Sequence, residues 1–245
     1  MDKLAVVFLH HEYKNRGYLN LAIESLLNQN LKNVEIVVVD SSESEEWDFH
    51  ESVRRLQVPH TTGSAVAANI GVKAVDQSAK YLLFANDDVI FAKGSVKELM
   101  IAMGDNTLIM NAFSNTDTEM YYWAEMPVPR FYDLEDIKGK EQVLMGYPIE
   151  RRVVFPVPFV CFYATMMPLK LWNELGGLDE NFTSGPDDRD FCMRAAQKGV
   201  PSMINLAPTI WHAGGKTIAT KNQDEVAANR VKNAKYFEEK WKTPQ

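Results

Sequence analysis

The stretch LAVVFLHHEYKNRGYLNLAIESLLNQNLKNVEIVVVDSS, Leu4 to Ser42, contains the pattern that decides the fold. It begins with a short, continuous apolar run rich in β-branched residues and closes on a similar run that ends at Asp40, and both runs are typical of buried strands. Between them, apolar residues recur at helical spacing, at Leu19, Ile23, Leu26 and Leu27. Strand, helix and strand in this order, without alternation in the strands, predict a parallel sheet covered by helices on both faces.

A third unit of the same kind follows. The alanine-rich segment GSAVAANIGVKAVDQSAK favours a helix, and it leads into YLLFANDD, an apolar strand that begins at Tyr81 and ends on carboxylates. Asp40 and Asp88 therefore both fall where a strand gives way to a loop. Because ligands of open parallel sheets bind outside the carboxyl ends of the strands, that edge is the candidate site.

Composition and charge limit the class of protein. The 245 residues are 46% hydrophobic, which is ample for one packed α/β domain. The formal charge of −7 argues against a broad basic face for nucleic acid. No run approaches the ~18 consecutive apolar residues of a membrane-spanning helix, and the N-terminus has no cleavage pattern. Cys161 and Cys192 have no metal-type spacing, so we expect a soluble, cytoplasmic protein without disulfides or zinc.

The tripeptide NDD ends the third strand. Side chains two apart share a face of a strand, so Asn86 and Asp88 are expected to point together and Asp87 away from them. A hard cation, Mg²⁺ or Mn²⁺, prefers carboxylate oxygens, which suits Asp88, whereas the neutral Asn86 suits a hydroxyl of a bound nucleotide. Alternatively, NDD is an ordinary turn that caps backbone amides. Asp40 has the same two interpretations, a cap or an acceptor for a base or ribose.

A second acidic cluster lies in SGPDDRDFCMR. Pro186 suits a first helical turn, Asp187 and Asp188 follow it, and Asp190 can pair with Arg194 four residues on. Acids at a helix N-terminus are stabilised by the helix dipole whatever the function, which is the structural interpretation. The functional alternative is a general base that takes a proton from an attacking hydroxyl.

Two further features have a structural and a functional interpretation. His212 in IWHAGGKT follows an apolar strand. It is interpreted either as a structural histidine or as a ligand for Mn²⁺. The C-terminal segment predicts a helix that docks on the core of the protein, with peripheral contact to a membrane surface as the alternative. Its predicted apolar face consists of Ala227, Val231, Ala234 and Trp241.

Seven of these segments, in sequence order, resemble the signatures of GT-A-fold glycosyltransferases, specifically the inverting family 2. They are HHEYKNRGYLNLAIESLLNQ, VEIVVVDSSES, GSAVAANIGV, LLFANDDV, LWNELGGLDENF, PDDRDFCMRAAQKG and WHAGGKT, and they span about Val6 to Lys216. The resemblance implies one GT-A domain over residues 1–245, with a nucleotide-sugar-binding half to about residue 113. An acceptor-binding and catalytic half then extends to about residue 220, and a C-terminal helix follows.

The resemblance also implies the site. The donor would be a UDP-, dTDP- or GDP-linked sugar, and the acceptor a carbohydrate or glycoconjugate. NDD takes the place of the DXD motif, with Asp88 and His212 on a Mn²⁺ or Mg²⁺ ion and Asp87 as a rival ligand. Asp188 would be the catalytic base, beside Asp187 where the family usually has glutamate. The residues expected at the nucleotide sugar are His10, Glu12, Asp40, Asn69, Asn86 and Asp87.

Three alternatives remain open on the sequence. A retaining GT-A glycosyltransferase shares the fold and the metal. A nucleotidyltransferase also uses a parallel sheet and a carboxylate-held metal, but it usually needs a glycine-rich basic loop after its first strand, where this chain has only Gly17. A non-catalytic module that binds sugars or nucleotides would use the aromatic middle of the chain, about Met120 to Tyr147, for recognition.

Overall fold

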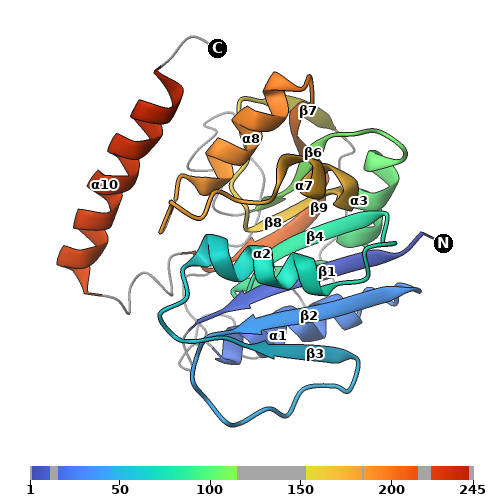
Figure 1. Ribbon diagram of the computed structural model, residues 1–245. Coiled ribbons are helices and arrows are strands. Elements are labelled where there is room, and N and C mark those ends of the chain that lie inside the picture. The colour runs from blue at the N-terminus through green and yellow to red at the C-terminus, as the bar shows by residue number, and fades with distance from the viewer. Residues whose placement is uncertain (1, 12–15, 115–152, 184, 215–221, 243–245) are drawn as a thin grey trace.

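A nine-stranded sheet with helices on both faces forms the body of the computed structural model, which describes residues 2–11, 16–114, 153–183, 185–214 and 222–242 (Figure 1). The strands are β1 Leu4–His10, β2 Val34–Asp40, β3 Val53–Gln57, β4 Tyr81–Asn86, β5 Val89–Phe91, β6 Ile109–Ser114, β7 Val154–Val157, β8 Ala164–Pro168 and β9 Ser202–His212. The helices are α1 Arg16–Leu27, α2 Ser64–Ala74, α3 Ser95–Met103, α7 Leu169–Leu175, α8 Asp187–Gln197 and α10 Gln223–Trp241.

The strand order is β3-β2-β1-β4-β8-β6-β9-β5, and β7 pairs with β9. The strands from β3 to β4 are parallel, as the sequence predicts. Beyond β4 the sheet is mixed, because β8 runs antiparallel to both β4 and β6, while β6 and β9 are parallel. The α/β class with a large, mostly parallel sheet is therefore confirmed, and the antiparallel strands lie in the C-terminal half.

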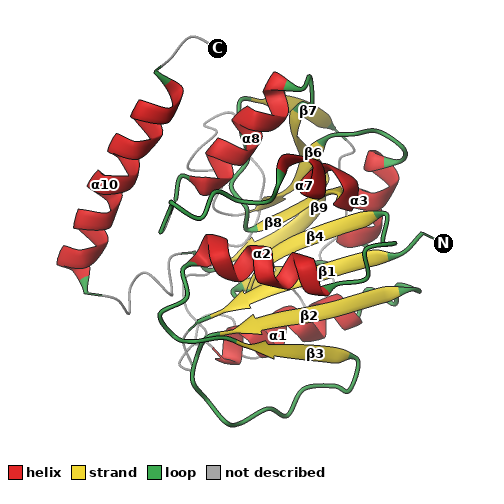
Figure 2. Ribbon diagram, viewed as in Figure 1, coloured by secondary structure: helices red, strands yellow, loops and turns green. Residues whose placement is uncertain are grey.

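Each face of the sheet has its own core. On β1, Val6 and Phe8 pack in one cluster with residues of α1 and α3, while Ala5 and Val7 pack in the other with residues of α2, α7 and α8. Figure 2 shows α2 in front of the sheet and α1 behind it. Continuous apolar strands arise because both faces are buried, which is the reason that they lack the alternation of a half-exposed sheet.

Gly71 lets α2 lie close to the sheet. A Cβ atom at this position would lie 2.6 Å from a methyl group of Val7 and 2.6 Å from one of Val39. Both valines are buried and β-branched, so neither side chain can rotate away freely. The small residues of the GSAVAANIGV segment thus set the distance between helix and sheet, and with it the position of the loop that precedes α2.

Three sequence-based expectations need correction. The edge strand β3, VRRLQ, was not expected, because its charges hide any apolar pattern. The proline- and aromatic-rich sequence from about Ser114 to Pro158 predicts irregular structure, but it contains the strand Val154–Val157. The apolar run FVCFYATMMP predicts a strand from Phe159, but the strand begins only at Ala164. The rest of the predicted aromatic segment, including Met120 to Tyr147, lies outside the described residues.

The helix α10 docks on the body of the protein through a different face from the one expected. Val231 is 71% exposed, and Ala227 and Ala234 are also exposed, whereas Asn233 is buried and Trp241 half-buried. The contacts are made by polar and aromatic side chains, and an apolar stripe therefore does not mark the docked face. Docking on the core of the protein is confirmed for this helix.

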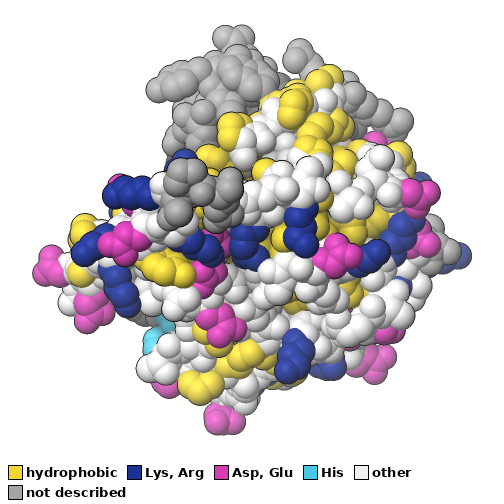
Figure 3. All heavy atoms as spheres, turned by 45° about the horizontal axis from the view of Figure 1, so that its top comes forward, with side chains coloured by type: hydrophobic (Ala, Val, Ile, Leu, Met, Phe, Trp, Pro, Cys, Tyr) yellow, Lys and Arg dark blue, Asp and Glu magenta, His cyan; other side chains and the backbone are white. Residues whose placement is uncertain are grey.

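Two surface properties complete the description. On the face in Figure 3, basic and acidic side chains are interspersed and form no single basic patch, in keeping with the net charge of −7. In the part of the chain that the structure describes, no helix combines the length and apolarity needed to cross a membrane.

Candidate functional site

Polar side chains from three parallel strands meet at one edge of the sheet. His10 ends β1 and lies in register with Asp40, which ends β2. Asn86 ends β4 and lies in register with Leu9 of β1. The parallel register brings the carboxyl ends of the three strands together, so the expected cluster at this edge is present.

His10 and Asp87 form a buried pair behind this edge. The Nδ1 atom of His10 lies 2.7 Å from Oδ2 of Asp87, and the two residues are 4% and 5% exposed. Burial and the charge of the neighbouring Asp88 raise the pKa of Asp87. The hydrogen bond with His10 lowers it by less than this, so the pKa is above its usual range. Asp87 is therefore anchored to β1, on the side away from Asn86.

Asp88 and His212 face each other on the opposite side of the turn. Oδ1 of Asp88 lies 3.2 Å from Nε2 of His212, and Nδ2 of Asn86 lies 3.4 Å from the same nitrogen. Asp88 and Asn86 thus share a side, as the strand period predicts, although β4 ends at Asn86 and both aspartates lie in a turn. Pairing of β5 with β9 holds the histidine there, because Val89 is in register with His212.

The carboxylate of Asp88 has the chemistry of a cation ligand. Its Oδ1 atom is buried and accepts no hydrogen bond from any described residue, since the contact with His212 lacks hydrogen-bond alignment. A buried, unsatisfied carboxylate oxygen is costly, and a bound cation would satisfy it. In the described ranges no group of three or more His, Cys, Asp and Glu side chains could hold a metal ion.

Asp40 is already paired with groups of the protein. Its Oδ1 atom accepts from the amide of Ser42 at 2.8 Å, and its Oδ2 atom accepts from Nε of Arg55 at 2.8 Å. Burial alone would raise the pKa of Asp40, but the hydrogen bonds from Ser42 and Arg55 outweigh it and hold the pKa below its usual range. Asp40 is an ionised end of β2 that fixes the loop after the strand.

Asn69 on α2 joins the helix to the loop after α7. Its Nδ2 atom donates to the carbonyl of Leu178 and to Oε1 of Glu180, both at 2.9 Å, and its Oδ1 atom accepts from the amide of Leu178 at 2.9 Å. Gly177 leaves room for this contact, because it has a φ of +76° and a Cβ there would lie 2.3 Å from Oδ1 of Asn69. The expected role of Asn69 at a nucleotide sugar stays a prediction.

Asp187 and Asp188 begin α8, and both are half-buried. Burial and the adjacent Asp188 carboxylate raise the pKa of Asp187 to about 6. Burial also raises the pKa of Asp188, although amide hydrogen bonds from Arg189 and Phe162 oppose the shift. The predicted pair Asp190 and Arg194 is present, with 2.8 Å between Oδ2 and Nε. The carboxylates of Asp187 and Asp188 thus have the raised proton affinity of a general base. The carboxylate of Asp190 instead forms a salt bridge with Arg194.

A short segment, Cys161–Tyr163, connects the two acidic groups. The amide of Phe162 donates to the Asp188 carboxylate. The carbonyl of Tyr163 accepts from the amide of Asn86 at 2.9 Å, and the ring of Tyr163 stacks on His212 with ring centres 4.9 Å apart. Three consecutive residues therefore contact both the helix-start carboxylate and the side chains around Asp88.

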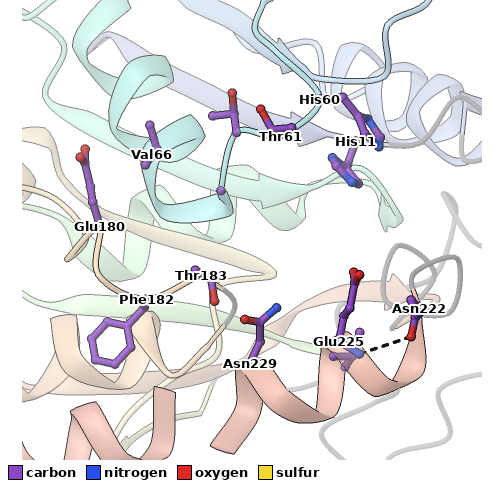
Figure 4. Close-up of a pocket in the computed structure, with 13 residues that line it drawn as sticks. His11, His60, Thr61, Val66, Glu180, Phe182, Thr183, Asn222, Glu225 and Asn229 are labelled. Atoms are coloured by element: carbon purple, nitrogen blue, oxygen red, sulfur yellow. Dashed lines mark hydrogen bonds between the residues drawn. The ribbon is translucent and has the colours of Figure 1, made fainter. Parts of the chain in front are cut away.

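A pocket of about 520 Å³ opens beside the strand ends (Figure 4). The rings of His11 and His60 stack at 4.3 Å at one end, and Ser41 hydrogen-bonds both through its hydroxyl and carbonyl oxygens. Its lining comes from the residue after β1, the loop before α2 and the start of that helix, the loop before α8, and the first half of α10 with its cap. These residues are His11, His60, Thr61, Thr62, Gly63, Val66, Glu180, Phe182, Thr183, Asn222, Glu225, Val226 and Asn229.

Residues 6–174 match the model of the family described as Glycosyl transferase family 2, which is well over half of the chain. The chain belongs to glycosyl transferase family 2. The match includes the strand ends of β1, β2 and β4 and stops before α8. The predicted family is confirmed, and it is a family of transferases.

Relatives and solved structures agree with this family. Two proteins named "Uncharacterized glycosyltransferase", from Rickettsia bellii and Haemophilus influenzae, are 29% and 27% identical over 45% and 40% of this chain. A structure of GalNAc-T7 with UDP, GalNAc and Mn²⁺ has a TM-score of 0.65 at 13% identity and covers 86% of this chain. A mannosyltransferase from Pyrobaculum calidifontis in complex with GDP-Man and Mn²⁺ has a TM-score of 0.62 at 14% identity over 88% of this chain.

The family 2 glycosyltransferase described here covers only part of each of these proteins. The matches span 17% and 42% of the two relatives, and 44% and 58% of the two solved chains. At such low identity the structural likeness establishes the fold alone, and it confirms the expected GT-A fold.

Sequence reasoning did not find all residues of the site. Glu12, expected at the nucleotide sugar, lies outside the described residues. His11 and His60 were not singled out, although both line the pocket and stack on each other. The HisHis pair after β1 was a visible signal, but His60 follows β3, a strand whose charged sequence gave no reason to look beyond its end.

Proposed function

We propose that this family 2 glycosyltransferase moves a sugar from a nucleoside diphosphate donor to a hydroxyl group of a carbohydrate or glycoconjugate acceptor, with a divalent cation and with inversion. The observation that carries the proposal is the contact of Cys161–Tyr163 with both Asp188 and the side chains around Asp88. The proposed base, Asp188, and the proposed cation site around Asp88 thus both contact the segment Cys161–Tyr163.

Asp88 and His212 would hold the cation, Mn²⁺ or Mg²⁺. The unsatisfied Oδ1 atom of Asp88, 3.2 Å from Nε2 of His212, fits a hard ion that takes its remaining ligands from phosphate oxygens and water. When bound, such an ion neutralises charge on the leaving nucleoside diphosphate. The similar structures of GalNAc-T7 and of the Pyrobaculum calidifontis mannosyltransferase are complexes with Mn²⁺, which supports the same choice here.

Asp188 is the proposed base. Its carboxylate takes the proton of the acceptor hydroxyl while the oxygen forms a bond to the anomeric carbon and the bond from that carbon to the diphosphate breaks. Burial raises the pKa of Asp188, which makes the carboxylate a stronger base than a solvated aspartate. Asp187 lies beside it, and the charge of Asp188 raises the pKa of Asp187.

The nucleotide end of the donor is proposed to lie at the strand ends, in contact with His10, Asp40, Asn86 and the Asp87 turn. The pocket beside them, with the stacked His11 and His60, extends the site toward α2. Similar structures are complexes with UDP, UDP-GlcNAc or GDP-Man, which supports a donor with either a uridine or a guanosine diphosphate here.

A donor screen tests this function directly. UDP-, GDP- and dTDP-linked sugars are compared for thermal stabilisation with and without Mn²⁺, because a ligand that binds only the folded state raises Tm. We expect one base class to stabilise the protein only with Mn²⁺. Binding without release of nucleoside diphosphate, with any acceptor tried, would favour a non-catalytic module instead.

The role of Asp188 has a separate test. Asp188→Asn should lower kcat about 10²- to 10⁴-fold, the contribution of a general base, and leave the Kd for the nucleoside diphosphate unchanged. Glu24→Gln, an exposed change on α1, is the matched control. Unchanged turnover in Asp188→Asn would remove this residue from the role, and NMR of the product anomer would show retention if the mechanism is not inverting.

A further inference from the structure

The helix α10 begins 36 residues after α8 starts, yet its side chains hold the segment that carries the two acids. Asn233 alone among the residues of α10, all of which are described, is fully buried, at 1% exposed. Its Nδ2 atom donates to the carbonyl of Gly185 at 2.9 Å, and its amide group exchanges contacts of 3.4 to 3.5 Å with the hydroxyl of Thr183. A buried polar side chain on an otherwise exposed helix thus binds the loop immediately before Asp187.

A second contact lies one to two turns further along α10. Nζ of Lys240 lies 2.6 Å from Oδ2 of Asp179 and 2.7 Å from Oδ1 of Asp190. Trp241 donates from Nε1 to the same oxygen of Asp190 at 3.1 Å, and Tyr236 donates its hydroxyl to Asp179 at 2.9 Å. Asp179 precedes Asp187 and Asp188 in the sequence, and Asp190 follows them. Side chains of α10 therefore bind the chain on both sides of Asp187 and Asp188.

The charges in this contact are balanced. Burial alone would raise the pKa of Asp179, but hydrogen bonds from Lys240, the Asn181 amide and Tyr236 hold it well below its usual range. Asp190 is completely buried and is shared by Lys240 and Arg194. Lys240 on α10 therefore balances the charges of two carboxylates, one on each side of Asp187 and Asp188.

We propose that α10 is a positioning element for the proposed base, and that Asn233 and Lys240 act through residues 185–190 to fix Asp187 and Asp188. This inference rests on the proposed function, because it assigns to α10 the placement of Asp188 against an acceptor hydroxyl. Neither side chain need touch the substrate. The role of Asn233 and Lys240 is to keep the start of α8 in the position in which Asp187 and Asp188 are half-buried.

A positioning role predicts a specific kinetic pattern. A displacement of about 1 Å at a reacting group can cost about 10²-fold in rate, while a donor held by other elements still binds. The expected donor contacts lie at the ends of β1, β2 and β4, whereas the side chain of Asn233 contacts Thr183 and Gly185. Loss of the Asn233 contact should therefore lower kcat and leave the KM for the donor unchanged.

The test compares three variants of the full chain. Asn233→Leu keeps the side-chain size and removes both hydrogen-bonding groups, and Tyr236→Phe removes one hydroxyl contact to Asp179 without loss of the ring. Lys232→Leu, at an exposed neighbouring position, is the control. The measurements are kcat and KM for the donor found in the screen, nucleoside diphosphate release as the readout, and hydrogen exchange of the peptide covering residues 185–190.

We expect Asn233→Leu to lower kcat about tenfold or more, with the KM for the donor within about twofold, and to speed exchange at residues 185–190 but not in β1 or β4. Tyr236→Phe should show a smaller change in the same direction, and it decides the matter if Asn233→Leu does not fold. Unchanged kcat, or a fall in kcat with equally faster exchange throughout the chain, would overturn the proposal. If the wild type turns over no nucleotide sugar, the proposed function fails. Unchanged hydrogen exchange at residues 185–190 in Asn233→Leu would by itself overturn the positioning role.

Discussion

Replacement of Lys240 by methionine isolates the electrostatic part of α10 docking. The side chain of Lys240 is 25% exposed, and its ammonium group lies within 2.7 Å of the fully buried carboxylate of Asp190 and of Asp179, whose side chain is 15% exposed. Methionine keeps most of the stem of the side chain and removes the charge. The change therefore leaves two carboxylates with less compensation, and little apolar contact is lost.

The expected loss of stability follows from what remains after the substitution. Removal of one partner from a buried ion pair costs about 3 to 5 kcal/mol when the other charge is left alone. Here Asp190 keeps Arg194, and Asp179 keeps the hydroxyl of Tyr236, so we expect about 2 to 3 kcal/mol. For a chain of this size that corresponds to a fall in Tm of roughly 4 to 12 °C.

Urea denaturation of Lys240→Met and of the control Lys235→Met measures this difference. Lys235 lies 4.0 Å from Glu239 with both side chains mostly exposed, and its replacement should cost less than about 0.5 kcal/mol. The pKa of Asp179 is depressed in the folded protein, so its contribution is present above its unfolded pKa of about 3.9 and is lost as the pH falls toward the lower folded value. The gap between wild type and Lys240→Met should thus shrink below about pH 4. Equal stability of the two at neutral pH would refute the reasoning.

Three other predictions concern the core, the base and the cation. Gly71→Ala should lower the free energy of unfolding by about 2 kcal/mol, because its Cβ would lie 2.6 Å from two buried valine methyl groups. Gly63→Ala, at the N-cap of α2 with nothing within 4 Å, should lower it by only about 1 kcal/mol or less, the cost of a poorer cap. A smaller loss in Gly71→Ala than in Gly63→Ala in urea denaturation would contradict this. The rate kcat should rise with pH through an ionisation above the ordinary aspartate value of about 3.9, since burial raises the pKa of Asp188 and a base acts only when deprotonated, and a flat pH profile would argue against it. Asp88→Asn should weaken Mn²⁺-dependent binding of the nucleoside diphosphate by at least about tenfold in calorimetry, with Glu24→Gln unchanged, and equal binding by both variants would exclude Asp88 as the ligand.

The strand-end part of the site was predictable because it depends on two local periodicities. Continuous apolar runs indicate strands buried on both faces, and parallel strands place their carboxyl ends at one edge, so Asp40, Asn86 and Asp88 were expected there. The period of two also separated Asp87 from its neighbours, and the structure places Asp87 against His10 and Asp88 against His212. The roles of these residues in binding and catalysis stay predictions.

The contacts of α10 were not predictable in the same way, because hydrophobic periodicity records only apolar faces. Its docked side includes Asn233, which contacts Thr183 and Gly185. It also includes Tyr236, Lys240 and Trp241, whose partners Asp179 and Asp190 lie 50 or more residues earlier in the chain. Each of these side chains is ordinary on a solvated helix, and only the fold shows that the lysine is shared by two carboxylates. The same holds for Asp187 and Asp188, whose raised pKa values come from burial that the first turn of an isolated helix would not have. The proton affinity of the proposed base therefore depends on long-range packing, which is why a helix outside the matched family segment can govern it.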